Sequence, residues 1–237
     1  MAKEKQSLSG KIGPVVVYQL NGKNVVRSKP RRYKQTTGTK ARSKNFGKAS
    51  TLGAQLRSGL ERVIPFPKDI SMQTRLTGAI SKWLGTTALK DVQPQKHIPW
   101  LSDFEFNEKA KLNSRWKELL KVGEPTTDGI LLNIPAFIPV DVINGPAKTT
   151  SIECRIGAVS CNLLTQSGTK GFYTSFSFPN TDQKVATQEI LMKVNTKPGN
   201  VVLVVSSLVY FGNKGGEKVE REEVRWRPVS IIIAFHC

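Results

Sequence analysis

The stretch Asn200–Phe211, NVVLVVSSLVYF, is the clearest indicator of fold in this sequence. Its β-branched and aromatic residues favour a strand. Ser206 and Ser207 interrupt its apolar run, which is well short of the about 20 residues that a membrane-spanning helix needs. We therefore expect it to be a strand of a β-rich domain.

Short β-type segments separated by turns fill the chain from residue 128 to its end. Besides 200–211, the candidate strands are 129–135, 149–160, 172–178, 187–194 and 224–236. Gly, Pro and Asn cluster between them, as in 144–146 and 197–200, and Gly212–Gly216 is expected to be a hairpin tip. This alternation of short strands and turns predicts an antiparallel β-sandwich of about seven strands. Ile231–Phe235 is apolar at every position, so we expect it in the middle of a sheet.

Upstream, the apolar spacing changes to that of helices. The first expected helix carries the stripe Phe46, Ala49, Gly53, Leu56, Leu60 and Val63. The second carries the stripe Met72, Leu76, Ala79 and Trp83, with Asp69 or Ser71 as N-cap and Gly85 at its end. Because the connection is short and both stripes need cover, the helices are expected to pair.

Two segments join the helices to the sandwich. Ile98–Phe106, IPWLSDFEF, is predicted to be a strand. Asn113–Val122 is predicted to be a short helix, with a strand as the alternative.

The N-terminal region contains a hairpin signal. Val15–Tyr18 is rich in residues that favour strands, and Asn21-Gly22 is a strong two-residue turn sequence. Val25-Val26 is expected in the second strand of the hairpin. A hairpin over 11–28 is too small to be stable alone. It is expected to dock on its own domain or on a neighbouring subunit.

Positive charge is concentrated at the same end. The first 68 residues carry +14 of the chain's formal net charge of +18, with only Glu4 and Glu61 as acids. Ten basic residues and no acid occupy the span from Lys23 to Lys48, here called the basic arm: Lys23, Arg27, Lys29, Arg31, Arg32, Lys34, Lys40, Arg42, Lys44 and Lys48. Such a concentration fits a polyanion, an acidic partner surface, or free solvent.

Nucleic acid is the partner that we expect for the basic arm. Phosphate binding needs only positive charge and reach, and each phosphate contact releases a counterion. No zinc finger, RNP pattern or helix-turn-helix is evident, and Tyr33 and Phe46 are few aromatics for stacking bases. Binding without sequence specificity follows, with DNA and RNA both open. An acidic protein surface, or no specific partner, is the alternative.

Enzymatic signatures are missing from the sequence, and we expect no cofactor and no metal. His97 and His236 are far apart, and no HExxH, paired CxxC, GxSxG or Walker A motif occurs. His236 is expected at the surface. Asp103, Glu105 and Glu108 are expected on a solvated face. Cys154 and Cys161 would point to opposite faces of one strand, so no disulfide is expected between them. The remaining possibility of catalysis is a site that the fold itself assembles.

Localisation is expected to be cytoplasmic, or within an assembly after cytoplasmic synthesis. The first residues, MAKEKQSLSG, are charged and lack the apolar core of a signal peptide. No membrane partner is expected.

Two groups of short motifs resemble an uncharacterised family of bacterial proteins with a domain of unknown function. The first group is LSGKIGPV at 8–15 with GKNVVRSKP at 22–30. The second is RLTGA at 75–79, FEFN at 104–107 and IPAF at 134–137. The resemblance implies an origin in bacteria, their phages or mobile elements, and it implies no catalytic residues.

The expected fold is therefore α+β, with a basic hairpin and arm plus helices over 1–97 and a β-sandwich over 98–237. A basic arm ahead of a sandwich is also the plan of many small icosahedral virus coat proteins, an analogy of architecture alone. We expect a non-enzymatic structural or assembly protein that forms homo-oligomers and binds nucleic-acid phosphates through the arm. The alternative is a self-assembling subunit whose hairpin pairs with a neighbour and whose charge docks an acidic protein.

Overall fold

The computed structural model describes residues 9–20, 22–29, 34–64, 71–86, 96–116, 120–163, 165, 168 and 171–237. The chain divides into two compact units, residues 1–41 and 42–237. The expected boundary between 97 and 98 falls inside the second unit. Helices together with antiparallel strands confirm the α+β class, and the strands belong to three sheets rather than to one evident seven-stranded sandwich.

The first unit contains a three-stranded antiparallel sheet of order β1-β2-β3. Its strands are β1 Gly10–Ile12, β2 Val15–Leu20 and β3 Lys23–Ser28. Gly13 and Gly22 have φ of 56° and 75°, the left-handed region that tight hairpin turns require. The register Leu20↔Lys23 confirms the predicted two-residue turn, although Asn21 lies outside the described residues. The short strand β1 was not predicted.

Helix α1 runs from Thr37 to Gly59 and begins earlier than predicted. The backbone N–H of Thr39 donates to Thr36 Oγ1 at 3.2 Å, so a threonine caps the helix upstream of the predicted stripe. Phe46, expected on the buried stripe, is 53% exposed, and burial begins instead at Ala49. Leu52, absent from the predicted stripe, is fully buried.

Helix α2 runs from Met72 to Thr86 and shares a core with α1, which confirms the expected pairing. Met72, Leu76 and Trp83 are buried as predicted, and Asp69 lies outside the described residues. A Cβ added at Gly53 of α1 would stand 3.4 Å from Ile80 Cδ1 of α2. The missing side chain at Gly53 therefore permits the close approach of the two helices.

The largest sheet has the order β4-β12-β10-β7-β8, with β11 also paired to β10. Its strands are β4 Lys96–His97, β7 Thr149–Asn162, β8 Phe172–Pro179, β10 Asn200–Lys214, β11 Glu217–Glu220 and β12 Val229–His236. The predicted strands at 149–160, 172–178 and 200–211 are confirmed within a few residues. β12 lies between β4 and β10, as expected for its apolar sequence.

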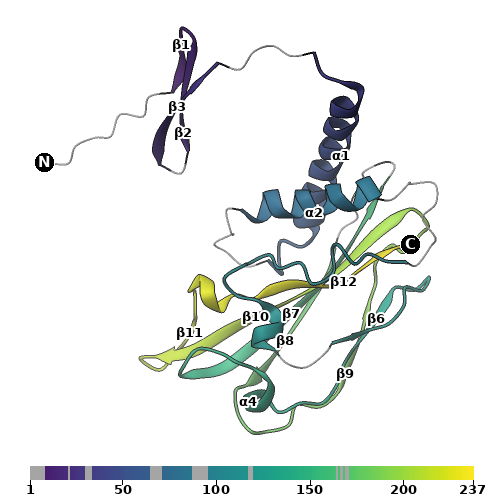
Figure 1. Ribbon diagram of the computed structural model, residues 1–237. Helices are drawn as coiled ribbons and strands as arrows, with labels where there is room; N and C mark the ends of the chain where they lie inside the picture. Colours follow the sequence, from purple (N-terminus) through teal and green to yellow (C-terminus); the bar gives the residue numbers. More distant parts are fainter. Residues whose placement is uncertain are drawn as a thin grey trace, which may run out of the picture. The chain divides into compact units, whose positions relative to one another are not determined.

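A third sheet covers the other face of the large one. It has the order β5-β6-β9, and its strands are β5 Lys121–Val122, β6 Ile130–Ile134 and β9 Gln188–Met192. Cys161 belongs to the core shared with the helices, whereas Cys154 belongs to the core shared with the third sheet. The two cysteines thus lie on opposite faces of β7, as predicted. The second unit is layered as helices, large sheet and small sheet (Figure 1).

Two connecting segments differ from expectation. Residues 98–106 form turns beside β12 rather than a strand: the N–H groups of Ile98, Asp103 and Phe106 donate to β12 carbonyls, and Asp103 has a φ of 60°. The predicted helix at 113–122 is shortened to α3 Leu112–Arg115, followed by β5, and 117–119 lie outside the described residues. A further short helix, α4, spans Pro139–Val142, and a 3-10 turn spans Val224–Trp226.

Candidate nucleic-acid interface

The structure places eight of the ten basic-arm residues. Lys23 and Arg27 lie on β3, Lys29 follows that strand, and Lys34 precedes α1. Lys40, Arg42, Lys44 and Lys48 lie on α1. Arg31 and Arg32 lie outside the described residues. All eight are exposed except Lys48, which is half-buried.

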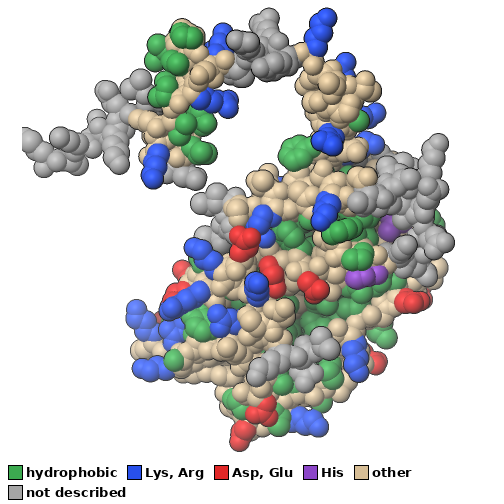
Figure 2. Space-filling model, in the orientation of Figure 1, with side chains coloured by type: hydrophobic (Ala, Val, Ile, Leu, Met, Phe, Trp, Pro, Cys, Tyr) green, Lys and Arg blue, Asp and Glu red, His purple; other side chains and the backbone are tan. Residues whose placement is uncertain are grey.

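On α1, the lysines recur at every fourth residue. Lys40, Lys44 and Lys48 therefore line one face of the helix, about 6 Å apart along its axis. Figure 2 shows Lys and Arg side chains along the outside of this helix. The buried residues of α1 are Ala49, Leu52, Gly53 and Leu56, which point away from the lysine face. The helix contains no acidic residue.

On the small N-terminal sheet, the register sets which side chains share a face. Lys11 pairs with Val16, and Val16 pairs with Arg27, so these three form one row across the strands. Residues directly opposite in antiparallel strands point to the same side. The Arg27 guanidinium carbon lies 5.3 Å from the centroid of the Tyr18 ring, one row further along.

Lys11 and Tyr18 were not among the predicted site residues, because the basic arm was defined from Lys23 to Lys48 and the hairpin was expected to dock on its own domain or on a neighbouring subunit. The period of two along 15–20, combined with the turn at 21–22, would have placed Tyr18, Arg27 and Lys23 on one face.

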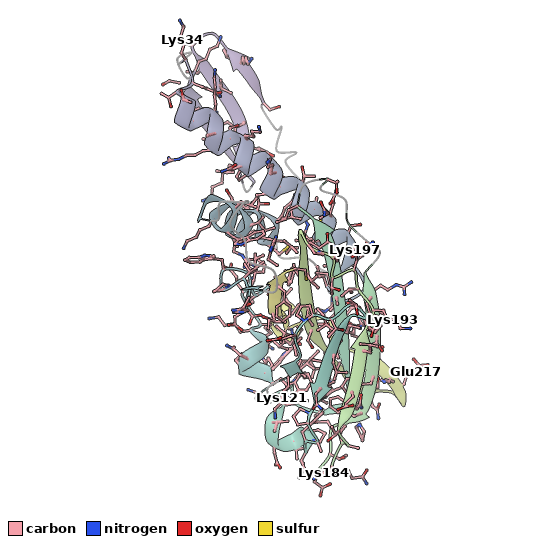
Figure 3. The ribbon with its side chains drawn as sticks, turned by 90° about the vertical axis from the view of Figure 1, so that its right-hand side faces the viewer. Lys34, Lys121, Lys184, Lys193, Lys197 and Glu217 are labelled. Carbon is pink, nitrogen blue, oxygen red and sulfur yellow. The ribbon has the colours of Figure 1, made fainter. Side chains whose placement is uncertain are left out.

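The basic arm is not neutralised internally within the described part of the chain. The ion pairs there join Arg75 to Glu108, Arg155 to Glu153, Arg225 to Glu223 and Arg227 to Glu220. All of these residues lie downstream of the arm. By contrast, carboxylates and cations are interspersed along residues 103–237, where Lys121 lies on β5 and Lys184 and Lys193 lie in the segments before and after β9 (Figure 3).

The acids proposed as a solvated face are not all solvated. Glu105 is half-buried, and its Oε1 accepts a hydrogen bond of 3.0 Å from the Leu112 N–H. Oε2 is buried and has no hydrogen-bond partner among the described residues. Burial raises the pKa of the Glu105 carboxyl to about 7, and the Leu112 N–H partly offsets this. Asp103 and Glu108 are exposed, as expected.

The histidine and cysteine side chains do not form a cluster that could bind a metal ion in the described part of the chain. His97 Nε2 is 2.6 Å from Ser102 Oγ. His236, expected at the surface, is instead 7% exposed, and its ring centroid is 6.3 Å from that of Trp83. The three cysteines are free and buried, and among the described residues no three His, Cys, Asp or Glu side chains form a group able to hold a metal ion.

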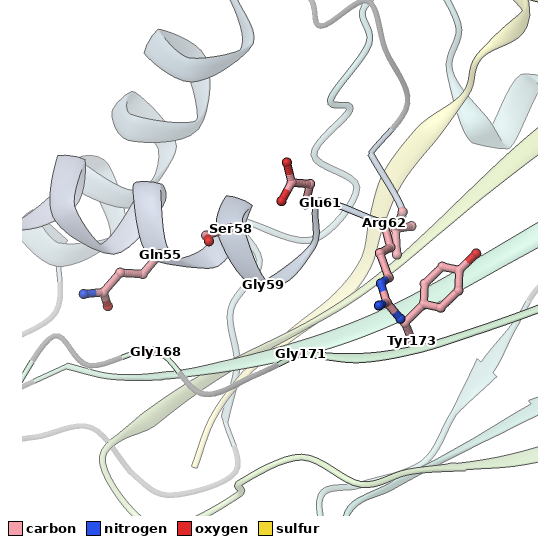
Figure 4. Close-up of a pocket in the computed structure, with 9 residues that line it drawn as sticks. Gln55, Ser58, Gly59, Glu61, Arg62, Gly168, Gly171 and Tyr173 are labelled. Carbon is pink, nitrogen blue, oxygen red and sulfur yellow. The ribbon is translucent and has the colours of Figure 1, made fainter.

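A cavity of about 510 Å³ lies between the C-terminal end of α1 and the segment before β8 (Figure 4). Its lining includes Gln55, Ser58, Glu61, Arg62 and Tyr173. The guanidinium carbon of Arg62 lies 5.7 Å from the Tyr173 ring centroid. The described lining residues contain neither histidine nor cysteine, and His97 and the acids at 103–108 are not among them.

No helix in the described ranges has the length and hydropathy needed to span a membrane.

Comparison with known proteins adds little. No protein-family model matches the chain, and no curated protein matches it. One solved structure that does match is described as "CC2D1B coordinates ESRCT-III activity during the mitotic reformation of the nuclear envelope". The match covers 84% of this chain and 87% of the other at 10% sequence identity, with a TM-score of 0.21. A superposition this loose supports no argument about fold or function.

Proposed function

We propose that this is a non-enzymatic structural or assembly protein whose basic arm binds nucleic-acid phosphates without sequence specificity. The observation that carries the proposal is the distribution of charge. The arm concentrates cations, nearly all exposed, whose charge no described carboxylate neutralises, while the cations of residues 103–237 are interspersed with acids.

Phosphate binding suits the arrangement of the lysines on α1. Three ammonium groups on one face, each about one turn from the next, can follow a backbone of regularly spaced phosphates. Ammonium groups act as point charges and do not read bases. The arm thus supports affinity and does not supply sequence recognition.

The second unit suits the role of scaffold. Strand β10 is buried along Asn200–Tyr210 because the helices cover one face of the large sheet and the small sheet covers the other. We interpret the two sheets as working together in the manner of a β-sandwich.

A truncation that spares α1 tests the proposal. Removing residues 1–34 deletes six of the ten arm cations, so binding to a fluorescent 30-nucleotide DNA should weaken and become less salt-dependent. Anisotropy titrations from 50 to 200 mM salt measure both effects. Equal affinity and equal salt dependence in the full-length and the truncated protein would contradict the proposal.

Self-association is the second candidate function, and a different observation favours it. Ile12 and Val26 are 56% and 63% exposed on one face of the small sheet, whose outer strands are β1 and β3. An apolar face beside outer strands that pair with no further strand among the described residues suits pairing with another subunit. Light scattering in 1 M salt tests this: a homo-oligomer held by β-pairing persists there, whereas one held by charge dissociates.

A further inference from the structure

We propose that one face of the N-terminal sheet, here called the Tyr18 face, is a stacking platform for the bases of single-stranded nucleic acid. This inference rests on the proposed function and extends it. It assigns base contact to Tyr18, with the cations of the sheet adding phosphate contacts to those of the lysines on α1.

The register defines the Tyr18 face. Val16, Tyr18 and Leu20 of β2 point to one side, and their cross-strand partners share it. The complete face comprises Lys11, Val16, Tyr18, Leu20, Lys23, Val25 and Arg27. The opposite face comprises Gly10, Ile12, Val15, Val17, Gln19, Asn24, Val26 and Ser28.

The two faces differ sharply in chemistry. Every cation of the three strands lies on the Tyr18 face, and so does their one aromatic residue. The opposite face has no charged or aromatic residue. Tyr18 is half-buried, and Leu20 beside it is 55% exposed. An aromatic ring that shares its face with three cations, without carboxylates on the same strands, matches a ligand that combines negative charge with flat apolar rings.

Arg27 can serve both parts of such a ligand. Its guanidinium carbon is 5.3 Å from the Tyr18 ring centroid. A guanidinium plane stacks on bases and also donates to phosphate oxygens. Lys11 is in the same row as Arg27 but two strands away, roughly 10 Å across the sheet. Lys23 is on β3 with Arg27, and Tyr18 lies opposite a position between the two. A strand crossing the ring can thus place its phosphates near the cations.

A single strand fits this face better than a duplex does. Bases inside a duplex are stacked on one another, whereas those of a single strand present their faces. Stacking also tolerates any base, which agrees with binding that lacks sequence specificity.

The test compares full-length Tyr18→Leu and Tyr18→Phe with the wild-type chain, using fluorescent dT30 and a 30-base-pair duplex. We expect Tyr18→Leu to bind dT30 about 5- to 150-fold more weakly with an unchanged salt slope, because a base stack and no phosphate contact is lost. Duplex binding should change less than twofold. Tyr18→Phe, which keeps the ring, should bind dT30 like the wild type. Tyr173→Leu, which removes a tyrosine that also lies beside an arginine, is the matched control and should bind normally.

Photocross-linking provides a readout that does not depend on stability. Irradiation of the wild-type complex with 5-iodouridine-substituted oligonucleotide should attach the strand to the peptide that contains Tyr18. If the wild type binds neither dT30 nor the duplex, the proposed function fails; if it binds the duplex alone, only the stacking platform is overturned. If the wild type binds with steep salt dependence but Tyr18→Leu binds equally well, or the cross-link falls outside residues 10–28, only the stacking platform is overturned.

Discussion

The hydroxyl of Ser207, in the centre of β10, donates a 2.9 Å hydrogen bond to the backbone carbonyl of Val63, just beyond the end of α1. Ser207 is completely buried, and Val63 is 1% exposed. A carbonyl after a helix end has no partner within the helix, so this serine supplies one. The bond fixes the end of the lysine-bearing helix to the middle of the scaffold sheet.

Replacing that serine should therefore destabilise the protein. Ser207→Ala leaves the buried Val63 carbonyl without its partner, which should lower the free energy of unfolding by about 1–3 kcal/mol. Urea denaturation followed by tryptophan fluorescence measures the change. Ser177→Ala on β8, where the side chain is exposed, is the control and should stay within about 0.5 kcal/mol of the wild type. Equal losses in the two variants would contradict this role of Ser207.

Glu105 should make stability fall as the solution becomes more alkaline. Its folded pKa is about 7 against an ordinary value of 4.5, so the folded protein retains a proton between these values that the unfolded chain releases. The stabilisation is complete below pH 4.5 and is lost as pH rises through 7. We expect the unfolding free energy to decline by about 1–2 kcal/mol between pH 5 and 8, less than full linkage because solvent partly screens the carboxyl.

Glu105→Gln should remove that decline, since the amide does not titrate. Glu108→Gln, an exposed neighbour paired with Arg75 at 3.3 Å, should preserve it. Denaturation curves at pH 5, 6, 7 and 8 make the comparison. A wild-type stability that is flat or rising over this range would show that the Glu105 carboxyl ionises normally.

The thiols should be unreactive in the folded protein. Burial raises the pKa of Cys154 to about 12 and that of Cys161 and Cys237 to about 11, so little thiolate exists at pH 8. Ellman's reagent should label none of the three within minutes under native conditions and all three in 6 M guanidinium chloride. Rapid labelling of the native chain would mean that one of these sites opens readily.

Sequence periodicity predicted the strands well because their apolar character is continuous and glycine, proline and asparagine mark their ends. It was wrong where covering elements decide burial. Phe46 continues the apolar spacing of α1. The spacing within a helix does not show, however, which of its turns are covered by other elements. His236 and Phe235 are neighbours on β12, so their side chains point to opposite faces of the sheet and one of them was expected at the surface. Both are buried because this sheet is covered on two sides.

Residues 98–106 show a different limit. Their alternation is typical of a strand, but Asp103 adopts a left-handed conformation that turns the chain beside β12. Only the three-dimensional partner reveals such a turn. For the candidate interface, amino-acid composition was enough to locate the basic arm. The Tyr18 face could be defined only from the strand register, because its residues come from three strands joined by two turns.

The salt dependence of DNA binding by a lysine-to-glutamine triple variant tests the central claim most directly. Lys40→Gln, Lys44→Gln and Lys48→Gln together remove three phosphate contacts, so the slope of log K against log salt for a 30-nucleotide single strand should fall by about 2. The matched triple Lys184→Gln, Lys193→Gln and Lys197→Gln removes the same charge from exposed sites on the second unit and should leave the slope within experimental error of the wild type. Equal reductions in both triples would show that general net charge binds the nucleic acid and that the basic arm has no special part in it.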